Sequence, residues 1–218
     1  GCPKHCSFCS VWRTDGQQPR QRGVDDVVAE VVALRRVGFR FILLADDNFY
    51  PVTHQDLAAA ARRTDKGHFE ELQAIREQRF ALMARLAKLP SDLVFFTQIT
   101  MEAGEDPVFL AAMHRARIRG ALVGVESVTQ SGLKSIYKNF NAAGDDMVTR
   151  LSTFRRHGGE GVGSFIFGLT TDTRDNFYEF GEGAHRAGLA FARFVRHNPC
   201  PGTIEFKKGA QCHGAGSG

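Results

Sequence analysis

The fold is indicated most clearly by residues 24–48, which read VDDVVAEVVALRRVGFRFILLADDN. In the first half of this stretch, valine and leucine recur at the spacing of one helix face, and Gly38 ends the pattern. The segment that follows, Phe39–Ala45, is almost continuously apolar, which is typical of a strand buried on both faces of a parallel sheet. We therefore expect a helix over 24–37 and then a buried strand, which together form the repeating unit of a parallel α/β fold.

The same alternation continues along the chain. Further helical patterns cover residues 55–88, with a break near Lys66 and Gly67, and residues 107–118, 129–137, 145–157 and 173–187. Further apolar strand patterns cover residues 93–100, 121–125, 162–167 and 190–195. Strict alternation with right-handed crossovers favours an α/β fold, a partial parallel (β/α)6 TIM-like barrel truncated at a first strand that would precede Gly1.

The composition is that of a globular protein with one core. Of the 218 residues, 43% are apolar and 24% are charged, which argues against disordered, collagen-like and disulfide-scaffold proteins. No apolar run approaches the roughly 20 residues that span a bilayer. We expect residues 1–206 to form one domain and the glycine-rich residues 207–218 to form a disordered tail. A net charge of +4 permits binding of nucleic acid or an anionic cofactor but requires neither.

Three cysteines lie in one short polar segment at the start of the chain. Cys2, Cys6 and Cys9 follow the pattern C-x3-C-x2-C, whereas Cys200 and Cys212 are far away in the sequence. Cysteine thiolates hold iron–sulfur clusters, and a cubane cluster normally takes four of them. With three thiolates, one iron would keep an open position for a substrate or cofactor, as catalytic metal sites do.

Other interpretations of the three cysteines remain open. A disulfide with one free thiol would suit a secreted protein, but the sequence shows no secretory signal. A structural zinc site would need a fourth ligand, for which His5, His197 or Cys212 could serve. In that case the chain would be a non-enzymatic binding module with a redox-silent metal.

Polar residues stand at the end of each expected strand. Because the carboxyl ends of parallel strands form the active face of such barrels, we expect these side chains on one rim, together with the cysteine segment. Gln98 and Thr100 would point to the same inner face and could contact a cofactor or a substrate. The full set comprises Asp46, Asp47, Asn48, Gln98, Thr100, Glu102, Glu126, Ser127, Arg193 and Arg196.

The cysteine segment resembles the signature of the radical S-adenosylmethionine (SAM) superfamily, C-x3-C-x-aromatic-C, which Cys2, Cys6, Phe8 and Cys9 match. The resemblance implies that the three cysteines bind a [4Fe–4S] cluster whose open iron chelates the amino and carboxylate groups of SAM. It also implies that one electron from the cluster cleaves SAM to a 5′-deoxyadenosyl radical. Phe8 would shield the cluster from water and pack on the adenine.

The same resemblance implies which other residues contact SAM. Asp46 and Asp47 stand where the superfamily binds the methionyl ammonium group. Glu126, followed by Ser127, stands where many members place an acid near the ribose hydroxyls or the amino group. The stretch that ends at Gly168 resembles the strand segment beside the adenine, where glycine lets the backbone approach closely.

Four stretches further resemble the cobalamin-binding branch of the superfamily: residues 9–13, 46–49, 123–127 and 199–203. Within that branch the sequence is most similar to the hopanoid C-3 methylases, which methylate ring A of a bacterial triterpenoid. The resemblance implies that a corrin-binding domain, absent from this sequence, would precede Gly1 and hold the cobalamin.

The resemblance also implies the partners and the location. We expect a small-molecule or lipid substrate, with a hopanoid as the suspected one, and a one-electron donor such as flavodoxin or ferredoxin. We expect no nucleic-acid partner and a cytoplasmic protein, peripheral to the inner membrane if the substrate is a lipid. An alternative within the superfamily is a methylthiotransferase acting on tRNA, which would need a second cluster site and an RNA-binding extension.

Overall fold

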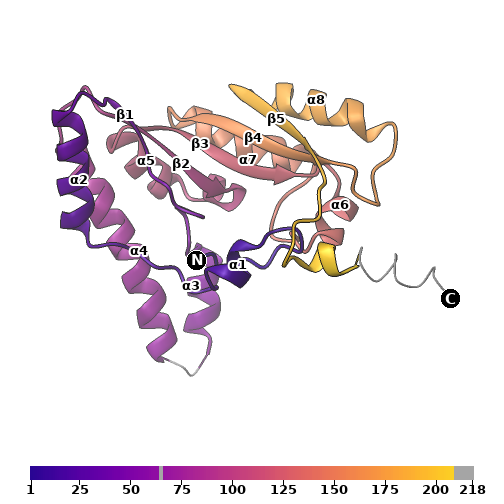
Figure 1. Cartoon of the computed structure of the whole chain (residues 1–218), viewed down its shortest axis with the longest axis horizontal. Coiled ribbons are helices and arrows are strands. Elements are labelled where there is room, and N and C mark those ends of the chain that lie inside the picture. The colour runs from indigo at the N-terminus through magenta and orange to yellow at the C-terminus, as the bar shows by residue number, and fades with distance from the viewer. Residues whose placement is uncertain (64–65, 209–218) are drawn as a thin grey trace.

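The computed structural model describes residues 1–63 and 66–208 of the chain. Within these residues, parallel strands form one sheet in the order β1-β2-β3-β4-β5, and the sheet curls into a half-barrel (Figure 1). This confirms the predicted α/β class and the partial TIM-like barrel. The strands are β1 (Phe41–Leu43), β2 (Val94–Thr100), β3 (Ile118–Glu126), β4 (Glu160–Phe167) and β5 (Phe191–Arg196).

Helices connect the strands, as the alternating pattern predicts. They are α1 (Val11–Thr14), α2 (Val24–Arg36), α3 (His54–Ala61), α4 (Lys66–Ala87), the 3-10 helix η1 (Met101–Glu105), α5 (Pro107–Arg115), α6 (Gln130–Ser135), α7 (Gly144–Arg156) and α8 (Asn176–Arg186). The expected break in the long helical region is confirmed between the end of α3 and the start of α4. No described helix is long and apolar enough to cross a membrane.

Polar side chains fix where several helices begin. Thr53 starts α3 with a capping box, in which the Asp56 N–H donates to the threonine hydroxyl and the Asp56 carboxylate accepts from the Thr53 N–H. Asp106 caps α5 by accepting from the Phe109 N–H at 3.0 Å, and Pro107 occupies the first turn, where its missing N–H costs nothing.

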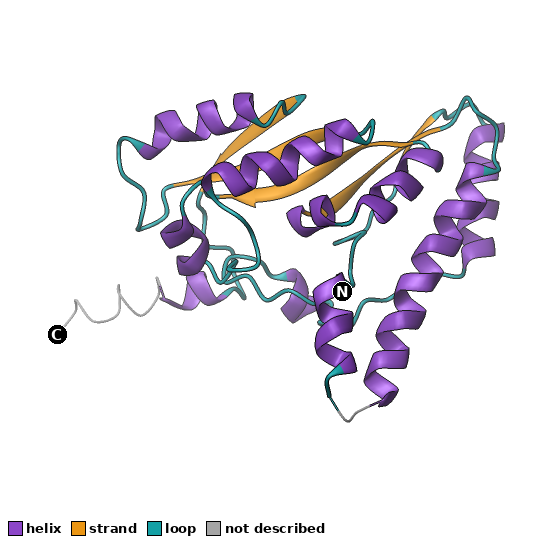
Figure 2. Cartoon of the chain, turned by 180° about the vertical axis from the view of Figure 1, so that it is seen from behind, coloured by secondary structure: helices purple, strands orange, loops and turns teal. Residues whose placement is uncertain are grey.

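Helices α5, α7 and α8 cover one face of the sheet (Figures 1 and 2). The main hydrophobic core lies between these helices and the side chains of β2, β3 and β4 that point toward them. Near its centre the Phe109 ring makes edge contacts with the rings of Phe49, Tyr50 and Phe80, at centroid distances of 6.1, 4.8 and 5.5 Å. Such edge-to-face packing is a favoured arrangement of aromatic rings.

The expectation that Phe39–Ala45 forms a strand buried on both faces is wrong. Only Phe41–Leu43 is a strand, and it alternates, with Ile42 buried and Phe41 and Leu43 more than half exposed. The reason is that β1 is an edge strand, and the concave face of the half-barrel is open in the described part of the chain. On the opposite edge, β5 is exposed in the same way at Phe191.

Phe109→Ala should lower the free energy of unfolding by about 3–5 kcal/mol, because the buried ring loses its contacts and leaves a cavity. Val108→Ala, on the exposed neighbour, should change it by no more than about 0.5 kcal/mol. Urea unfolding followed by circular dichroism measures both values. Equal effects in the two variants would contradict the placement of Phe109 at the centre of the core.

Candidate functional site

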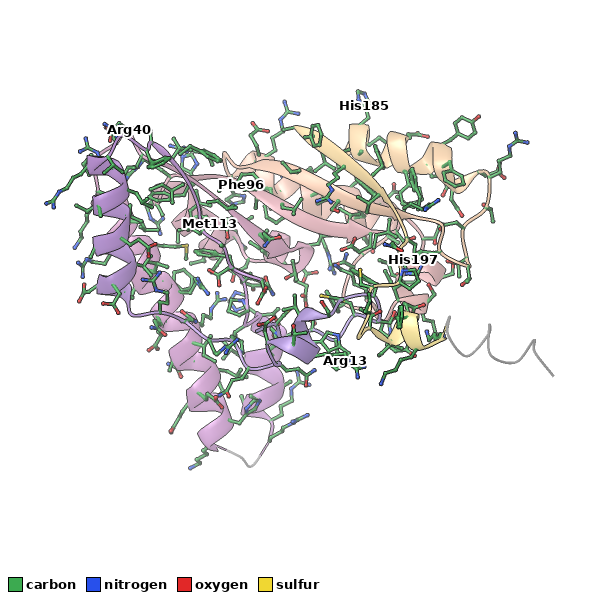
Figure 3. The ribbon with its side chains drawn as sticks, viewed as in Figure 1. Arg13, Arg40, Phe96, Met113, His185 and His197 are labelled. Carbon is green, nitrogen blue, oxygen red and sulfur yellow. The ribbon has the colours of Figure 1, made fainter. Side chains whose placement is uncertain are left out.

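The cysteine loop, residues 1–10, lies at the end of the half-barrel where the strands terminate (Figure 1). Ser7 anchors it on two sides. Its N–H donates to the carbonyl of Ile136, just after α6, at 3.0 Å, and its carbonyl accepts from the N–H groups of Ile204 and Glu205 at 3.1 and 3.3 Å. The loop is therefore held between the end of α6 and the helical turn at 204–208, which we call the C-terminal clasp. His197 and Arg13 lie at the same end of the molecule (Figure 3).

The three cysteines of the loop are free thiols that burial keeps protonated. Burial raises the pKa of Cys2 and of Cys9, and it raises the pKa of Cys6, the most buried of the three, to about 11. Lys138 opposes this shift at all three thiols. Because only the thiolate binds metal, loading of this site would release protons.

The donor set of the loop fits an iron–sulfur cluster. Three thiols from one short segment lie close enough to one another for their charges to interact, and the Trp12 indole N–H donates to the Cys6 carbonyl at 3.0 Å over one side of the loop. Within residues 1–63 and 66–208, no three His, Cys, Asp or Glu side chains converge in metal-binding geometry as they stand. Cluster binding would therefore require rotation of the cysteine side chains toward a common centre.

Zinc would require a fourth ligand from the same region. Neither His5 nor His197 joins the thiols in a metal-binding group among the described residues. The third candidate ligand, Cys212, lies outside the described residues, as does most of the expected tail, from residue 209 onward.

Glu126 is placed beside the cysteine loop by an irregularity in the sheet. The register between β3 and β4 shifts between Gly124 and Glu126, and Glu126 has a φ of 67°, which is rare for a residue with a side chain. Its carboxylate accepts from the Lys138 Nζ at 2.9 Å, and both side chains are buried. Asn141 holds the bulge by donating to the carbonyls of Gly124 and Val125 at 2.9 and 3.1 Å.

A second, partly buried ion pair joins Lys4 of the loop to Glu102. The Lys4 Nζ donates to the Glu102 carboxylate at 2.9 Å, and Lys4 also lies over the ring of Phe140 at 4.5 Å from its centroid. Lys138 approaches the same ring at 5.6 Å, so that Phe140 contacts both lysines. Burial raises the pKa of Glu102, and Lys4 partly offsets that shift. Both lysines were missed in the sequence analysis, because no local pattern shows that a distant glutamate will pair with them.

The two aspartates after β1 have different surroundings. Both oxygens of Asp46 accept from the buried Arg79 guanidinium, at 2.9 and 3.0 Å, and Arg79 lies over the Phe49 ring. Asp47 lies 3.1 Å from the amino group of Gly1 and close enough to Cys2 to raise the pKa of that thiol. Asp47 is therefore the aspartate that lies at the cysteine loop, whereas Asp46 is engaged by α4.

Gln98 and Thr100 are hydrogen-bonded to the turn that follows β1. The Gln98 amide donates to the Asp46 carbonyl at 2.9 Å, and the Thr100 N–H donates to the Asn48 side chain at 3.2 Å. Their expected common face is consistent with the alternation of β2, in which Phe95, Thr97 and Ile99 point toward the helices. The two residues hold the Asp46–Asn48 turn at the rim.

Phe8, Ser127 and Gly168 lie at or against the ends of β3 and β4, whereas Arg193 and Arg196 lie within β5, with Arg193 in the middle of the strand and Arg196 at its end. Phe8 packs against a small apolar cluster that contains Ile166 and Leu169, which brings the loop to the end of β4. Gly168 has a φ of 89° and donates its N–H to Asp172 at 2.8 Å. Ser127 is fully buried, and its hydroxyl accepts from the Thr129 N–H at 3.3 Å.

A separate cavity lies away from the cysteine loop. It has a volume of about 300 Å3 and opens between α2, α4 and the free edge of β1. Asp46 and Arg79 contribute to its lining, but none of the cysteines does. The candidate site is therefore the cysteine loop, together with Asp47, Glu102 and Glu126, and not this cavity.

Thr203→Ala should loosen the C-terminal clasp. The buried Thr203 hydroxyl donates to the Cys200 carbonyl at 2.6 Å and accepts from the Phe206 N–H at 3.1 Å, so its loss should cost about 1 kcal/mol of stability, as for a helix cap. Amide exchange of residues 204–206 and alkylation of Cys6, measured by mass spectrometry, should become faster. Lys207→Ala, on an exposed position of the same turn, is the control. Unchanged alkylation in Thr203→Ala would show that the clasp does not protect the loop.

Comparison with known proteins gives several matches. The chain is 26% identical over 174 residues to the hopanoid C-2 methylase of Rhodopseudomonas palustris, covering 79% of this chain and 29% of that protein. It is 36% identical over 129 residues to the tRNA-2-methylthio-N(6)-dimethylallyladenosine synthase of Pseudomonas aeruginosa, covering 53% of this chain and 28% of that protein. The chain therefore spans less than a third of the length of either relative.

Solved structures match the fold over nearly the whole chain. The radical SAM methyltransferase TsrM from Kitasatospora setae, with cobalamin and a [4Fe–4S] cluster bound, superposes with a TM-score of 0.73 and 17% identity, covering 98% of this chain and 36% of TsrM. The cobalamin-dependent SAM radical enzyme OxsB has a TM-score of 0.66 and 16% identity, covering 99% of this chain and 29% of OxsB. Both likenesses support the half-barrel fold.

A family match covers most of the chain and includes the cysteine loop. Residues 1–182 match the radical SAM superfamily, and this range contains Cys2, Cys6 and Cys9 together with β1 to β4. The family implies a [4Fe–4S] cluster and SAM as cofactors, in agreement with the thiol donor set of the loop. The chain belongs to the radical SAM superfamily.

Proposed function

We propose that this chain is the radical SAM core of a cobalamin-dependent methyltransferase that acts on an unactivated carbon. The observation that carries the proposal is the clasped three-cysteine loop, which lies at the carboxyl ends of the strands beside two buried glutamates. The likeness to the methyltransferase TsrM and the distant relationship to a hopanoid methylase support the methyltransferase assignment, and the likeness to TsrM and OxsB supports the use of cobalamin.

In the proposed enzyme, Cys2, Cys6 and Cys9 bind the cluster as thiolates. Once bound, the [4Fe–4S] cluster supplies the electron that cleaves SAM to methionine and a 5′-deoxyadenosyl radical. Asp47, which lies close to Cys2, accepts a hydrogen bond from the SAM ammonium group. Phe8, packed at the end of β4, excludes water from the loop.

The other side chains of the site orient the nucleoside. Glu126, buried and held by Lys138, accepts hydrogen bonds from the ribose hydroxyls. Gly168 allows the backbone after β4 to lie close to the adenine, because glycine adopts a positive φ readily and has no side chain between the backbone and the cofactor. Asp46 supports the same rim through Arg79, with Gln98 bonded to its carbonyl and Ser127 buried below Glu126.

A hopanoid-like lipid is the substrate that we propose for the methyl transfer. Its apolar body would suit the concave face of the half-barrel, where Phe41, Leu43 and Phe191 are exposed. The register places Leu43 beside Phe96, and Phe191 beside Val162, on that same face. In this proposal cobalamin would be held by a further domain of the full protein, and none of the described residues would contact the corrin.

The proposal includes the partners and the location. The electron would come from flavodoxin or ferredoxin, which places the enzyme in the cytoplasm, peripheral to the inner membrane when it meets a lipid. No nucleic acid takes part. The second candidate is a tRNA methylthiotransferase, which the 36% identity to the Pseudomonas aeruginosa synthase favours. Iron content of the full-length protein separates the two, because a methylthiotransferase needs a second cluster site.

The anaerobically reconstituted protein should show the electron paramagnetic resonance signal of a reduced cubane after dithionite is added, and SAM should shift that signal. Cys6→Ala should abolish the signal because it removes one of three ligands, while Cys200→Ala should retain it because that thiol is exposed and outside the loop. Release of 5′-deoxyadenosine, measured by chromatography, should likewise be lost in Cys6→Ala and retained in Cys200→Ala. One tightly bound zinc and no such signal would refute the proposal.

Gly168→Ala should destabilise the protein by about 1–2 kcal/mol, because a φ of 89° is strained for any residue with a Cβ. It should also weaken SAM binding several-fold by moving the backbone beside the adenine. Gly181→Ala, inside α8 and with open space around its Cβ, should be neutral or stabilising. Thermal unfolding and equilibrium binding of SAM test both variants. Wild-type SAM affinity in Gly168→Ala would exclude that segment from the cofactor site.

A further inference from the structure

Lys138 is a buried cation whose only role in the proposed reaction so far is its pairing with Glu126. It follows α6, in the segment whose Ile136 carbonyl accepts from the Ser7 N–H of the cysteine loop. Burial acts to lower its pKa, but Glu126 and the neighbouring thiols raise it, and the net pKa is higher than usual. The lysine therefore remains charged beside the three cysteines.

The sheet is shaped to hold this lysine against Glu126. The two side chains meet at 2.9 Å above Gly124. A Cβ atom at Gly124 would lie 2.5 Å from the Glu126 Oε1 and 2.7 Å from the Lys138 Nζ, which is too close for any side chain. A residue other than glycine at this position would displace the ion pair, so the pair and the glycine form one unit.

The charge of the pair acts on the loop that binds the cluster. Lys138 interacts electrostatically with Cys2, Cys6 and Cys9, and Glu126 acts with the opposite sign on Cys6 and Cys9. A cubane with three thiolates has a formal charge of −1 when oxidised and −2 when reduced. A nearby cation favours the reduced form and a nearby carboxylate disfavours it, since local charge is one determinant of such potentials.

We propose that Lys138 is a positioning residue that holds Glu126 toward SAM and, by offsetting its charge, keeps the cluster reducible. The inference rests on the proposed function, because it requires that the loop binds the cluster. The step that it concerns adds one electron from dithionite or a one-electron donor protein to the cluster, and no bond forms or breaks. Without Lys138, a buried carboxylate would oppose that electron.

Redox titration of the reconstituted protein without SAM tests the inference. Lys138→Met should lower the equilibrium constant for reduction about tenfold, a shift of about 59 mV for one electron, and Lys138→Arg should restore it to within about twofold. Glu126→Gln should shift the potential in the opposite direction, because it leaves the lysine uncompensated. The double variant Lys138→Met/Glu126→Gln should return near the wild-type value. Lys134→Met removes the same charge from an exposed position and should change nothing.

The outcomes separate this inference from the proposed function. A wild-type protein that forms no cluster refutes the proposed function, and the inference falls with it. A cluster whose potential is the same in Lys138→Met, Glu126→Gln and wild type overturns the inference alone. If Lys138→Met does not fold because the Glu126 carboxylate is left unpaired, Glu126→Gln and the double variant decide the outcome. In neither of these variants is position 126 an unpaired buried carboxylate. A purely structural lysine would change stability without opposite shifts of potential.

Discussion

The parallel direction of the strands is the constraint on which the rest of the structure depends. Because every strand runs the same way, each of them ends at the same edge, and the polar residues that follow them must meet there. The cysteine loop is a short polar segment that cannot fold alone. It therefore depends on contacts with this edge of the sheet. Ser7 anchors it there through both its N–H and its carbonyl.

Charge at this edge is organised in opposed pairs. Lys4 with Glu102, and Lys138 with Glu126, place two cations and two carboxylates around one aromatic ring, so that little net charge is buried. Unpaired, any one of these groups would be costly to remove from water. The pairs therefore leave each of these carboxylates with a lysine as its partner.

The sequence predicts the sheet well because strand and helix patterns are local. The helix expected over 24–37 is observed as Val24–Arg36, and the strand expected over 93–100 as Val94–Thr100. The burial of Phe41 was predicted incorrectly, because whether a strand lies at an edge depends on its neighbours and not on its own residues. Lys138 was missed for the same reason, since its partner lies 12 residues away across a bulge.

Gly124, beneath the ion pair of Glu126 and Lys138, affects which positions of the sheet can be substituted without moving charged groups. Any side chain at Gly124 would force the Glu126–Lys138 ion pair to move. The exposed residues Phe41 and Leu43, on the edge strand β1, meet no such restriction. Over evolutionary time, one scaffold could therefore acquire new substrates from its open rim while its electron-accepting centre stays fixed.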